Sequence, residues 1–161
     1  MSTSPPLQQG FVRTDDGVQL FWKKIGEGSP ALVCCNGVGV STFFWKYLVR
    51  RFGPERSVIL WDYRGHGRSS IPGPLHRVDI PRMAMDLGCL LDELDINEAV
   101  LLGHSMGSQV ILERYRQEPE GIVGLVSVLG TFGHPLDTFG DMAFSRQIFD
   151  LVLQLTDSFP R

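Results

Sequence analysis

The sequence has few of the features that mark membrane, nucleic-acid-binding or disulfide-rich proteins. Its 161 residues include only 3 cysteines, and 15 basic against 18 acidic residues leave a net charge of −3. A chain without a basic excess has no electrostatic footprint for nucleic acid or for an anionic membrane. No apolar run is long enough to span a membrane, and residues 1–6 have neither the basic nor the apolar region of a signal peptide. We therefore expect no nucleic acid and no membrane among its partners.

The three cysteines are placed in a way that argues against a disulfide framework or a zinc site. Cys34 and Cys35 are adjacent in an apolar run, and Cys89 falls in a segment with helical periodicity. Adjacent cysteines lack metal-ligand spacing and usually behave as small buried hydrophobic residues. The sequence therefore predicts no metal, no cofactor and a reducing, cytoplasmic environment.

Apolar runs of strand length alternate with helical segments from residue 31 onward. The expected strands cover residues 11–14, 18–25, 31–35, 57–61, 98–102 and 122–129. The first two flank Asp15-Asp16-Gly17, which is typical of a hairpin turn. Strands that alternate with helices form a parallel sheet with helices on both faces. The predicted fold class is α/β, with an N-terminal antiparallel hairpin leading into a mostly parallel sheet.

Helical patterns separate these strands. Helices are expected over 42–52, over 106–117 and around 144–155. A further helix is expected to begin after Asp79, which serves as its N-cap. After Asp79, an apolar stripe indicates the buried side of a helix, with Arg82, Asp86 and Glu93 off that stripe. The stripe consists of Ile80, Met83, Leu87, Leu91 and Leu94.

The segment Gly103-His104-Ser105-Met106-Gly107 joins an apolar strand to a helix. Such a strand–turn–helix presents a serine hydroxyl at the carboxyl edge of a parallel sheet. Glycines two positions on either side let strand and helix approach closely. Free N–H groups at the start of the helix can stabilise an oxyanion there. The pattern favours Ser105 as a nucleophile, and the alternative is a structural turn.

A second glycine-rich loop, residues 36–41, follows the strand at 31–35. No Gly-Lys-Ser/Thr follows it, so it is not a phosphate-binding P-loop. Thr42 stands where a dinucleotide fingerprint requires glycine or alanine. Two interpretations remain, a simple turn and an anion-stabilising loop beside the serine. Loops at the carboxyl ends of parallel strands share one edge of the sheet, so the second interpretation brings both loops to one site.

Three segments in this order and spacing resemble the α/β-hydrolase family over roughly residues 11–140: 36–39, 62–69 and 103–107. The resemblance implies that Ser105 is the nucleophile and that the backbone N–H groups of Val38 and Met106 form the oxyanion hole. Asn36 replaces the histidine more usual in the family. Serine at position 105 also differs from the aspartate nucleophile of haloalkane dehalogenases and epoxide hydrolases.

A serine nucleophile implies acyl transfer on a small ester-like carbonyl substrate. Esterases, lactonases, C–C bond hydrolases, perhydrolases and aminopeptidases share these motifs, so the subclass stays open. The alternative function is a non-catalytic module of the same fold, or an inactive fragment.

The resemblance further implies that the family's sheet continues after the sixth strand, through a cap, to two strands that carry the acid and the base. On this view residues 1–10 are a flexible tail, 11–140 a partial core and 141–161 the start of a cap helix. After Ser105 the remaining candidates are His134 as base and Asp137 as acid, in the reverse of the family's order. A sheet that ends at its sixth strand has an open apolar edge, which predicts self-association.

Other polar residues of the motifs have structural interpretations. His66 and His104 are expected to hold their loops through hydrogen bonds, and His76 to lie at the surface. Asp62 and Arg64 are expected to pair or to cap within their own loop.

Overall fold

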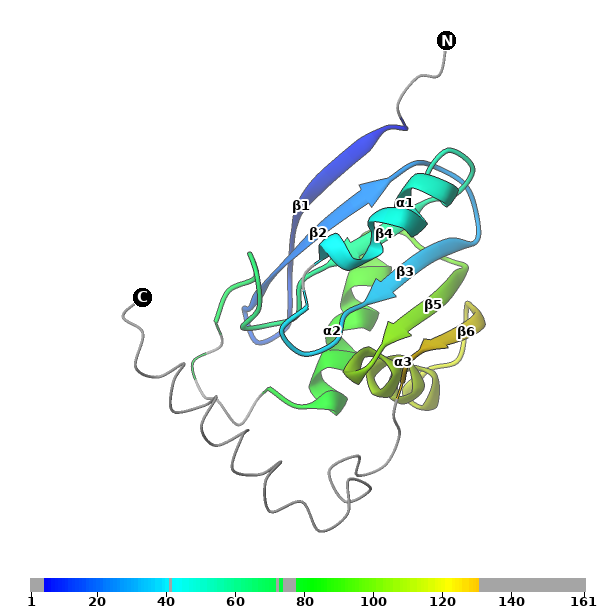
Figure 1. Cartoon of the computed structure of the whole chain (residues 1–161). Helices are drawn as coiled ribbons and strands as arrows, with labels where there is room; N and C mark the ends of the chain where they lie inside the picture. The colour runs from blue at the N-terminus through cyan, green and yellow to red at the C-terminus, as the bar shows by residue number, and fades with distance from the viewer. Residues whose placement is uncertain (1–4, 41, 72, 74–77, 131–161) are drawn as a thin grey trace, which may run out of the picture. The chain divides into compact units, whose positions relative to one another are not determined.

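Six strands form one mixed sheet in the described part of the chain. The computed structural model describes residues 5–40, 42–71, 73 and 78–130. The strands are β1 (Leu7–Arg13), β2 (Gln19–Ile25), β3 (Ala31–Cys35), β4 (Val58–Trp61), β5 (Ala99–His104) and β6 (Ile122–Val128). Their order is β1-β2-β4-β3-β5-β6, with β1 and β2 antiparallel and the last four strands parallel (Figure 1). The predicted α/β fold class with its N-terminal antiparallel hairpin is confirmed.

Strand β1 begins earlier than expected. Leu7 pairs with Ile25 and Gly10 with Trp22, so the predicted flexible tail over residues 1–10 is wrong for residues 7–10. The pattern missed this part of the strand because an edge strand that is exposed on both faces needs no apolar alternation. Backbone hydrogen bonds to β2, which do not depend on side-chain type, hold it in the sheet.

Helices cover both faces of the sheet. They are η1 (a 3₁₀-helix, Thr42–Trp45), α1 (Lys46–Phe52), α2 (Ile80–Glu93) and α3 (Met106–Gln117). Val33 and Cys35 of β3 pack in one buried cluster with α2 and α3, and Cys34 packs in a second cluster with Trp45. Successive strand residues face opposite sides, so the two clusters lie on opposite faces. Cys34 and Cys35 are buried free thiols, as predicted.

Helix α2 follows the sequence prediction with one exception. The Asp79 carboxylate accepts the backbone N–H of Arg82 at 2.8 Å, which confirms the predicted N-cap. Met83, Leu87 and Leu91 of the apolar stripe are buried. Asp86, expected off that stripe, is also fully buried, and its partner on the loop after β4 supplies the reason below.

The helix expected over 42–52 is divided into η1 and α1. Trp45 is the last residue of the 3₁₀-helix η1. Its buried indole N–H donates to the Asn36 side chain at 2.8 Å. None of the described helices is both long and apolar enough to cross a membrane. The helix predicted around 144–155 lies outside the described residues.

Strand β6 is an outer strand of the described sheet. Val123, Leu125 and Val126 on it are exposed large apolar side chains. Unpaired strand edges with exposed apolar residues can pair with another chain. Self-association through this edge stays a prediction.

Candidate active site

Ser105 stands in a strained turn between β5 and α3. Its backbone has φ 52° and ψ −117°, and a positive φ is uncommon for a residue with a side chain. Its N–H donates to the Val128 carbonyl at the end of β6 at 3.1 Å, which ties the turn to the neighbouring strand. Strain of this kind persists only where the surrounding structure enforces it, and it concentrates at functional sites.

The two glycines that flank Ser105 permit the close approach of strand and helix. A Cβ atom on Gly107 would lie 2.2 Å from the Cys35 carbonyl oxygen. A Cβ atom on Gly103 would lie 2.5 Å from the backbone of Gly107. Both distances are far inside van der Waals contact, so the predicted need for residues without side chains is confirmed at these two positions.

The loop after β3 lies directly against the serine. A Cβ atom on Gly37 would lie 3.1 Å from Ser105 Cβ and 2.8 Å from His104 Nδ1. The expected convergence of the two glycine-rich loops is therefore present. Val38 follows Gly37 in this loop, and Met106 is the first residue of α3. The first N–H groups of a helix have no intrahelical acceptor.

Asn36 anchors the start of the same loop. Its side-chain amide donates to the Trp61 carbonyl at 3.0 Å and its oxygen accepts the Trp45 indole N–H, while the Tyr63 hydroxyl donates to its backbone carbonyl at 3.0 Å. Burial raises the pKa of Tyr63 above its ordinary value, so its hydroxyl remains a neutral donor. This role of Asn36 was not predicted from the sequence, although a polar residue directly after a largely buried strand was the available signal.

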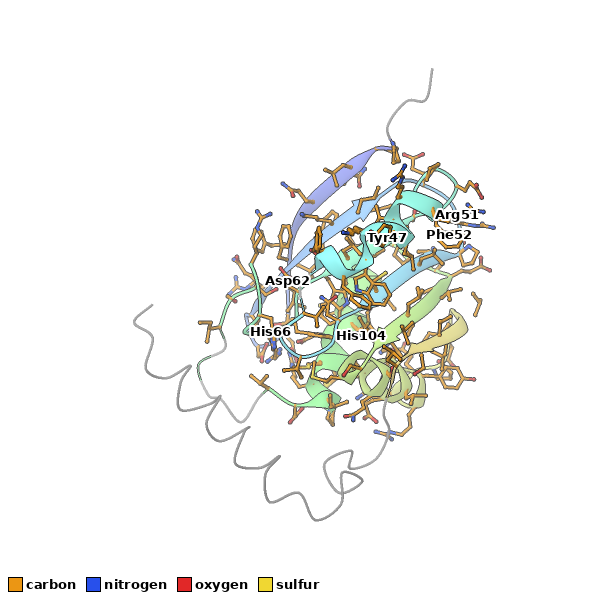
Figure 2. The ribbon with its side chains drawn as sticks, viewed as in Figure 1. Tyr47, Arg51, Phe52, Asp62, His66 and His104 are labelled. Carbon is orange, nitrogen blue, oxygen red and sulfur yellow. The ribbon has the colours of Figure 1, made fainter. Side chains whose placement is uncertain are left out.

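The loop after β4 is held by Asp62 and adjoins a small cleft. The Asp62 carboxylate accepts the Arg68 backbone N–H at 3.0 Å, and Gly67, with φ 53°, leaves room for it. His66 Nδ1 lies 3.0 Å from the Arg64 carbonyl oxygen, so its predicted role within the loop is confirmed. Figure 2 shows Asp62 and His66 together on this loop, and they line a cleft of about 150 Å³ with Val40.

Arg64 lies in a buried ion cluster and not against Asp62, so of the two expectations the pairing is wrong, while Asp62 caps within its own loop as expected. The fully buried guanidinium donates to Asp86 at 2.6 and 2.7 Å and to Asp16 at 2.9 and 3.2 Å. Arg82 lies 2.9 Å from Asp16. The two hydrogen bonds from Arg64 offset the free-energy cost of desolvating the buried Asp86 carboxylate. The cluster joins the hairpin turn, the loop after β4 and α2.

This cluster predicts a specific loss of stability in acid. Hydrogen bonds from Arg64 hold the pKa of Asp16 well below its ordinary value of 3.8. A group whose pKa is depressed by folding stabilises the fold above its unfolded pKa and loses that contribution as the pH falls through the folded value. Below about pH 4, Asp16 alone should lower the free energy of unfolding by up to about 1.4 kcal/mol per pH unit.

Urea unfolding of wild type and Asp16→Asn between about pH 6 and about pH 3 checks this expectation. The variant should be less stable at the higher pH and should lose less stability on acidification. Glu55→Gln is the matched control, because the ion pair of Glu55 with Arg51 is exposed and contributes little to stability. Equal slopes in wild type and Asp16→Asn would contradict the assignment.

His104 differs from its prediction. Its ring stacks on Phe44, with centroids 4.1 Å apart and an interplanar angle of 31°. Within the described part of the chain its buried Nδ1 has no hydrogen-bond partner, so the expected hydrogen bond from this nitrogen is absent. Figure 2 shows His104 at the end of β5, and Ser105 is the next residue in the sequence. Aromatic stacking therefore connects η1 to the turn that carries the serine.

Other parts of the described chain do not contribute to the candidate site. A larger cavity of about 580 Å³ lies among charged side chains of α2 and α3, and Ser105 does not line it, so backbone geometry and not cavity size locates the candidate site. The candidates His134 and Asp137, together with His76, lie outside the described residues. Across the described ranges, no group of three His, Cys, Asp or Glu side chains could hold a metal ion.

Known proteins resemble this chain in sequence. Among curated proteins, the chain is 28% identical to bifunctional epoxide hydrolase 2 of Sus scrofa over 123 residues, which cover 76% of this chain and 22% of the relative. It is 36% identical to 3-oxoadipate enol-lactonase 2 of Acinetobacter baylyi over 95 residues, which cover 58% of this chain and 35% of the relative.

Solved structures of known proteins also superpose on this chain. A hydrolase from Pseudomonas aeruginosa superposes with a TM-score of 0.74 at 28% identity, covering 91% of this chain and 53% of that one. An esterase from Exiguobacterium antarcticum superposes with a TM-score of 0.71 at 26% identity, covering 76% and 46%. The chain thus spans about half the length of these two structures and 22% to 35% of the two curated relatives. The alpha/beta hydrolase fold profile matches residues 30–153, and the chain belongs to that family.

Proposed function

We propose that the protein is a serine hydrolase that transfers an acyl group from a small ester-like substrate to Ser105 and then to water. The observation that carries this proposal is the backbone of Ser105, which is strained at φ 52° and lies in sequence between Gly103 and Gly107, two positions where no Cβ fits. Strain of this kind presents a nucleophile at the end of a strand. The relatives include an epoxide hydrolase and an esterase, and a serine at this position favours ester chemistry.

In the proposed reaction, Ser105 Oγ attacks the substrate carbonyl carbon and gives up its proton to a base. The oxyanion of the tetrahedral intermediate accepts hydrogen bonds from the backbone N–H groups of Val38 and Met106. The carbon–oxygen bond to the leaving group breaks, and the leaving oxygen takes the proton. Water then attacks the carbonyl carbon of the acyl-serine and gives its proton to the base, the bond between that carbon and Ser105 Oγ breaks, Oγ takes the proton, and the acyl group leaves as a carboxylic acid. The contact of Gly37 with Ser105 supports placing the Val38 loop at the oxyanion.

The base is the unassigned part of this mechanism. Of the two described histidines, His66 contacts its own loop through Nδ1 and His104 stacks on Phe44. Neither forms a hydrogen bond with Ser105 within the described residues. This observation favours the second candidate function, a non-catalytic module of the same fold. In the catalytic proposal His134 remains the candidate base within this chain, and Asp137 the candidate acid.

Labelling with a fluorophosphonate, followed by intact mass, distinguishes the two functions. We expect one adduct on the wild-type chain and none on Ser105→Ala, because the reagent reacts only with an activated serine. Ser29→Ala is the matched control and should label like the wild type, since Ser29 donates to Glu98 at the surface. Loss of labelling in His134→Ala would assign the base. A folded wild-type chain that takes up no label would support the non-catalytic function and overturn the proposal.

A further inference from the structure

The outer surface of η1 and α1 combines basic and aromatic side chains. Five exposed residues form what is called here the basic–aromatic face: Phe43, Lys46, Tyr47, Arg50 and Arg51. Phe43 and Tyr47 are 69% and 71% exposed. Residues 42–54, which contain all five, include no aspartate or glutamate. Exposed large aromatic residues that cluster on a protein surface mark a site of interaction.

Most of the positive charge of this face is not paired with carboxylates. The ammonium of Lys46 lies 4.3 Å from the ring centroid of Phe43 and 4.8 Å from that of Tyr47. Among the described residues no ion pair joins Lys46 or Arg50 to a carboxylate, and Arg51 pairs only with the exposed Glu55. Figure 2 shows Tyr47 and Arg51 on α1. The face therefore attracts anionic groups.

A second group of cationic and aromatic side chains lies on the same side of the sheet. On β2, Phe21 alternates with Leu20 and Trp22, which pack in the cluster with α2 and α3, so Phe21 faces the side that α1 covers. The guanidinium of Arg68 lies 3.8 Å from the ring centroid of Phe21. Phe11 packs on the same ring at 5.5 Å and is 50% exposed. Basic and aromatic groups thus extend beyond α1 on this side.

The opposite side of the sheet has a different charge balance. The cavity of about 580 Å³ at α2 and α3 is lined by four carboxylates and two guanidiniums: Asp15, Asp92, Glu93 and Glu118, with Arg82 and Arg114. An anionic surface therefore attracts one side of the molecule and repels the other. The expectation of no membrane partner rests on the net charge of −3, which does not show how charge is divided between the two sides.

The shape and composition of the basic–aromatic face indicate its partner. The outside of a helix is convex, and neither of the two cavities described above is lined by η1 or α1. Extended peptides and single nucleic-acid strands are held in grooves or along sheet edges, whereas a convex face fits a broad surface. Exposed aromatic rings beside lysine and arginine are typical of helices that bind at the membrane–water interface. We propose that the basic–aromatic face binds the surface of a bilayer that contains anionic phospholipid, without spanning it.

Sedimentation of the whole chain with lipid vesicles tests this proposal. The vesicles consist of phosphatidylcholine alone or with about 30 mol% phosphatidylserine. We expect binding to the anionic vesicles that is about tenfold or more tighter than binding to the neutral vesicles. Salt at about 0.5 M should release the bound protein, because it screens exposed charges. Equal binding to both kinds of vesicle would overturn the proposal.

Two double variants separate this face from the net charge of the chain. Lys46→Gln with Arg50→Gln should weaken binding to the anionic vesicles about 25-fold, since each basic side chain near such a surface contributes about fivefold. Lys24→Gln with Arg116→Gln removes the same charge from the other side and should bind like the wild type. Lys24 faces that side by the alternation of β2, and Arg116 lies on α3. Equal weakening by the two double variants would contradict the assignment to this face.

The aromatic part of the face is tested separately. Tyr47→Ser should weaken vesicle binding about tenfold, because its ring leaves water for the interface. Tyr115→Ser is the matched control, since Tyr115 is 47% exposed but lies on α3. Unchanged binding of Tyr47→Ser, or equal weakening by both substitutions, would overturn the proposed contact.

This proposal does not depend on the proposed function. Ser105→Ala should bind the anionic vesicles like the wild type although it takes up no fluorophosphonate, so either proposal can fail alone. A wild-type chain that leaves the vesicles unbound but binds a poly-glutamate peptide through Lys46 and Arg50 would assign the face to an acidic protein and overturn the membrane proposal. A chain that binds neither probe would overturn it as well.

Discussion

Replacing Arg64 with leucine is expected to lower the free energy of unfolding by about 3–5 kcal/mol, because the buried Asp86 carboxylate loses both hydrogen bonds from Arg64 and keeps a 3.4 Å contact with Arg82. Arg64 and Asp86 are both fully buried, and the guanidinium donates two hydrogen bonds to that one carboxylate. When one member of a buried pair is removed, the other stays buried and its desolvation cost is no longer offset by hydrogen bonds. The loss would be measured by urea unfolding at neutral pH.

The matched control for this prediction is Arg51→Leu. Arg51 also pairs with a carboxylate, that of Glu55 at 3.2 Å, but both side chains are largely exposed. Exposed pairs contribute about 0–1 kcal/mol, so this variant should be nearly as stable as the wild type. Adding Asp86→Leu to Arg64→Leu should recover part of the loss, because no unpaired charge then stays buried. Equal effects of Arg64→Leu and Arg51→Leu would show that the buried cluster does not stabilise the fold.

Replacing Gly107 with alanine is expected to damage both the fold and the site. The added Cβ would lie 2.2 Å from the Cys35 carbonyl oxygen, 2.7 Å from its carbon and 2.8 Å from the Asn36 oxygen. These are backbone atoms of β3 and of the loop that follows it, so no side-chain rotation relieves the contact. We expect a loss of about 3 kcal/mol in the free energy of unfolding. The rate of fluorophosphonate labelling should fall about 100-fold, because the helix start is displaced from the serine.

Gly73→Ala provides the comparison for the glycine prediction. Among the residues that the structure describes, a Cβ on Gly73 would meet no atom within 4 Å, so this variant should match the wild type in both measurements. The result that would contradict the prediction is a Gly107→Ala chain with wild-type stability and labelling rate. In that case the contact between α3 and the loop after β3 would have to be far more compliant than its distances indicate.

Much of this fold could be predicted because its determinants are local. The apolar run at residues 31–35 is short and continuous, as expected of a strand covered on both faces. The cap at Asp79 depends on a hydrogen bond three residues away in sequence. The turn at Ser105 depends on glycines two residues to either side. Interactions of such short range can be recognised in the order of residues alone.

The errors all involve partners that are distant in sequence. Asp86 was expected off the apolar stripe of its helix, and the partner that accounts for its burial, Arg64, is 22 positions away. His104 was expected to form a hydrogen bond, but tertiary packing placed Phe44 against its ring. Nothing near residues 7–10 in the sequence shows that β2 pairs with them. In each case the deciding contact is made only after the chain has folded.

The sequence by itself therefore determined the α/β architecture, the strained turn at Ser105 and the glycine loop expected beside it. These features follow from the periodicity of apolar residues and from the conformational freedom of glycine, and both can be recognised without knowing which distant residues make contact. Only the tertiary structure decided how Asn36 anchors the loop, which carboxylates Arg64 holds and which aromatic ring packs on His104. Those features depend on burial, and a buried polar group takes whatever partner the folded chain brings within hydrogen-bond distance.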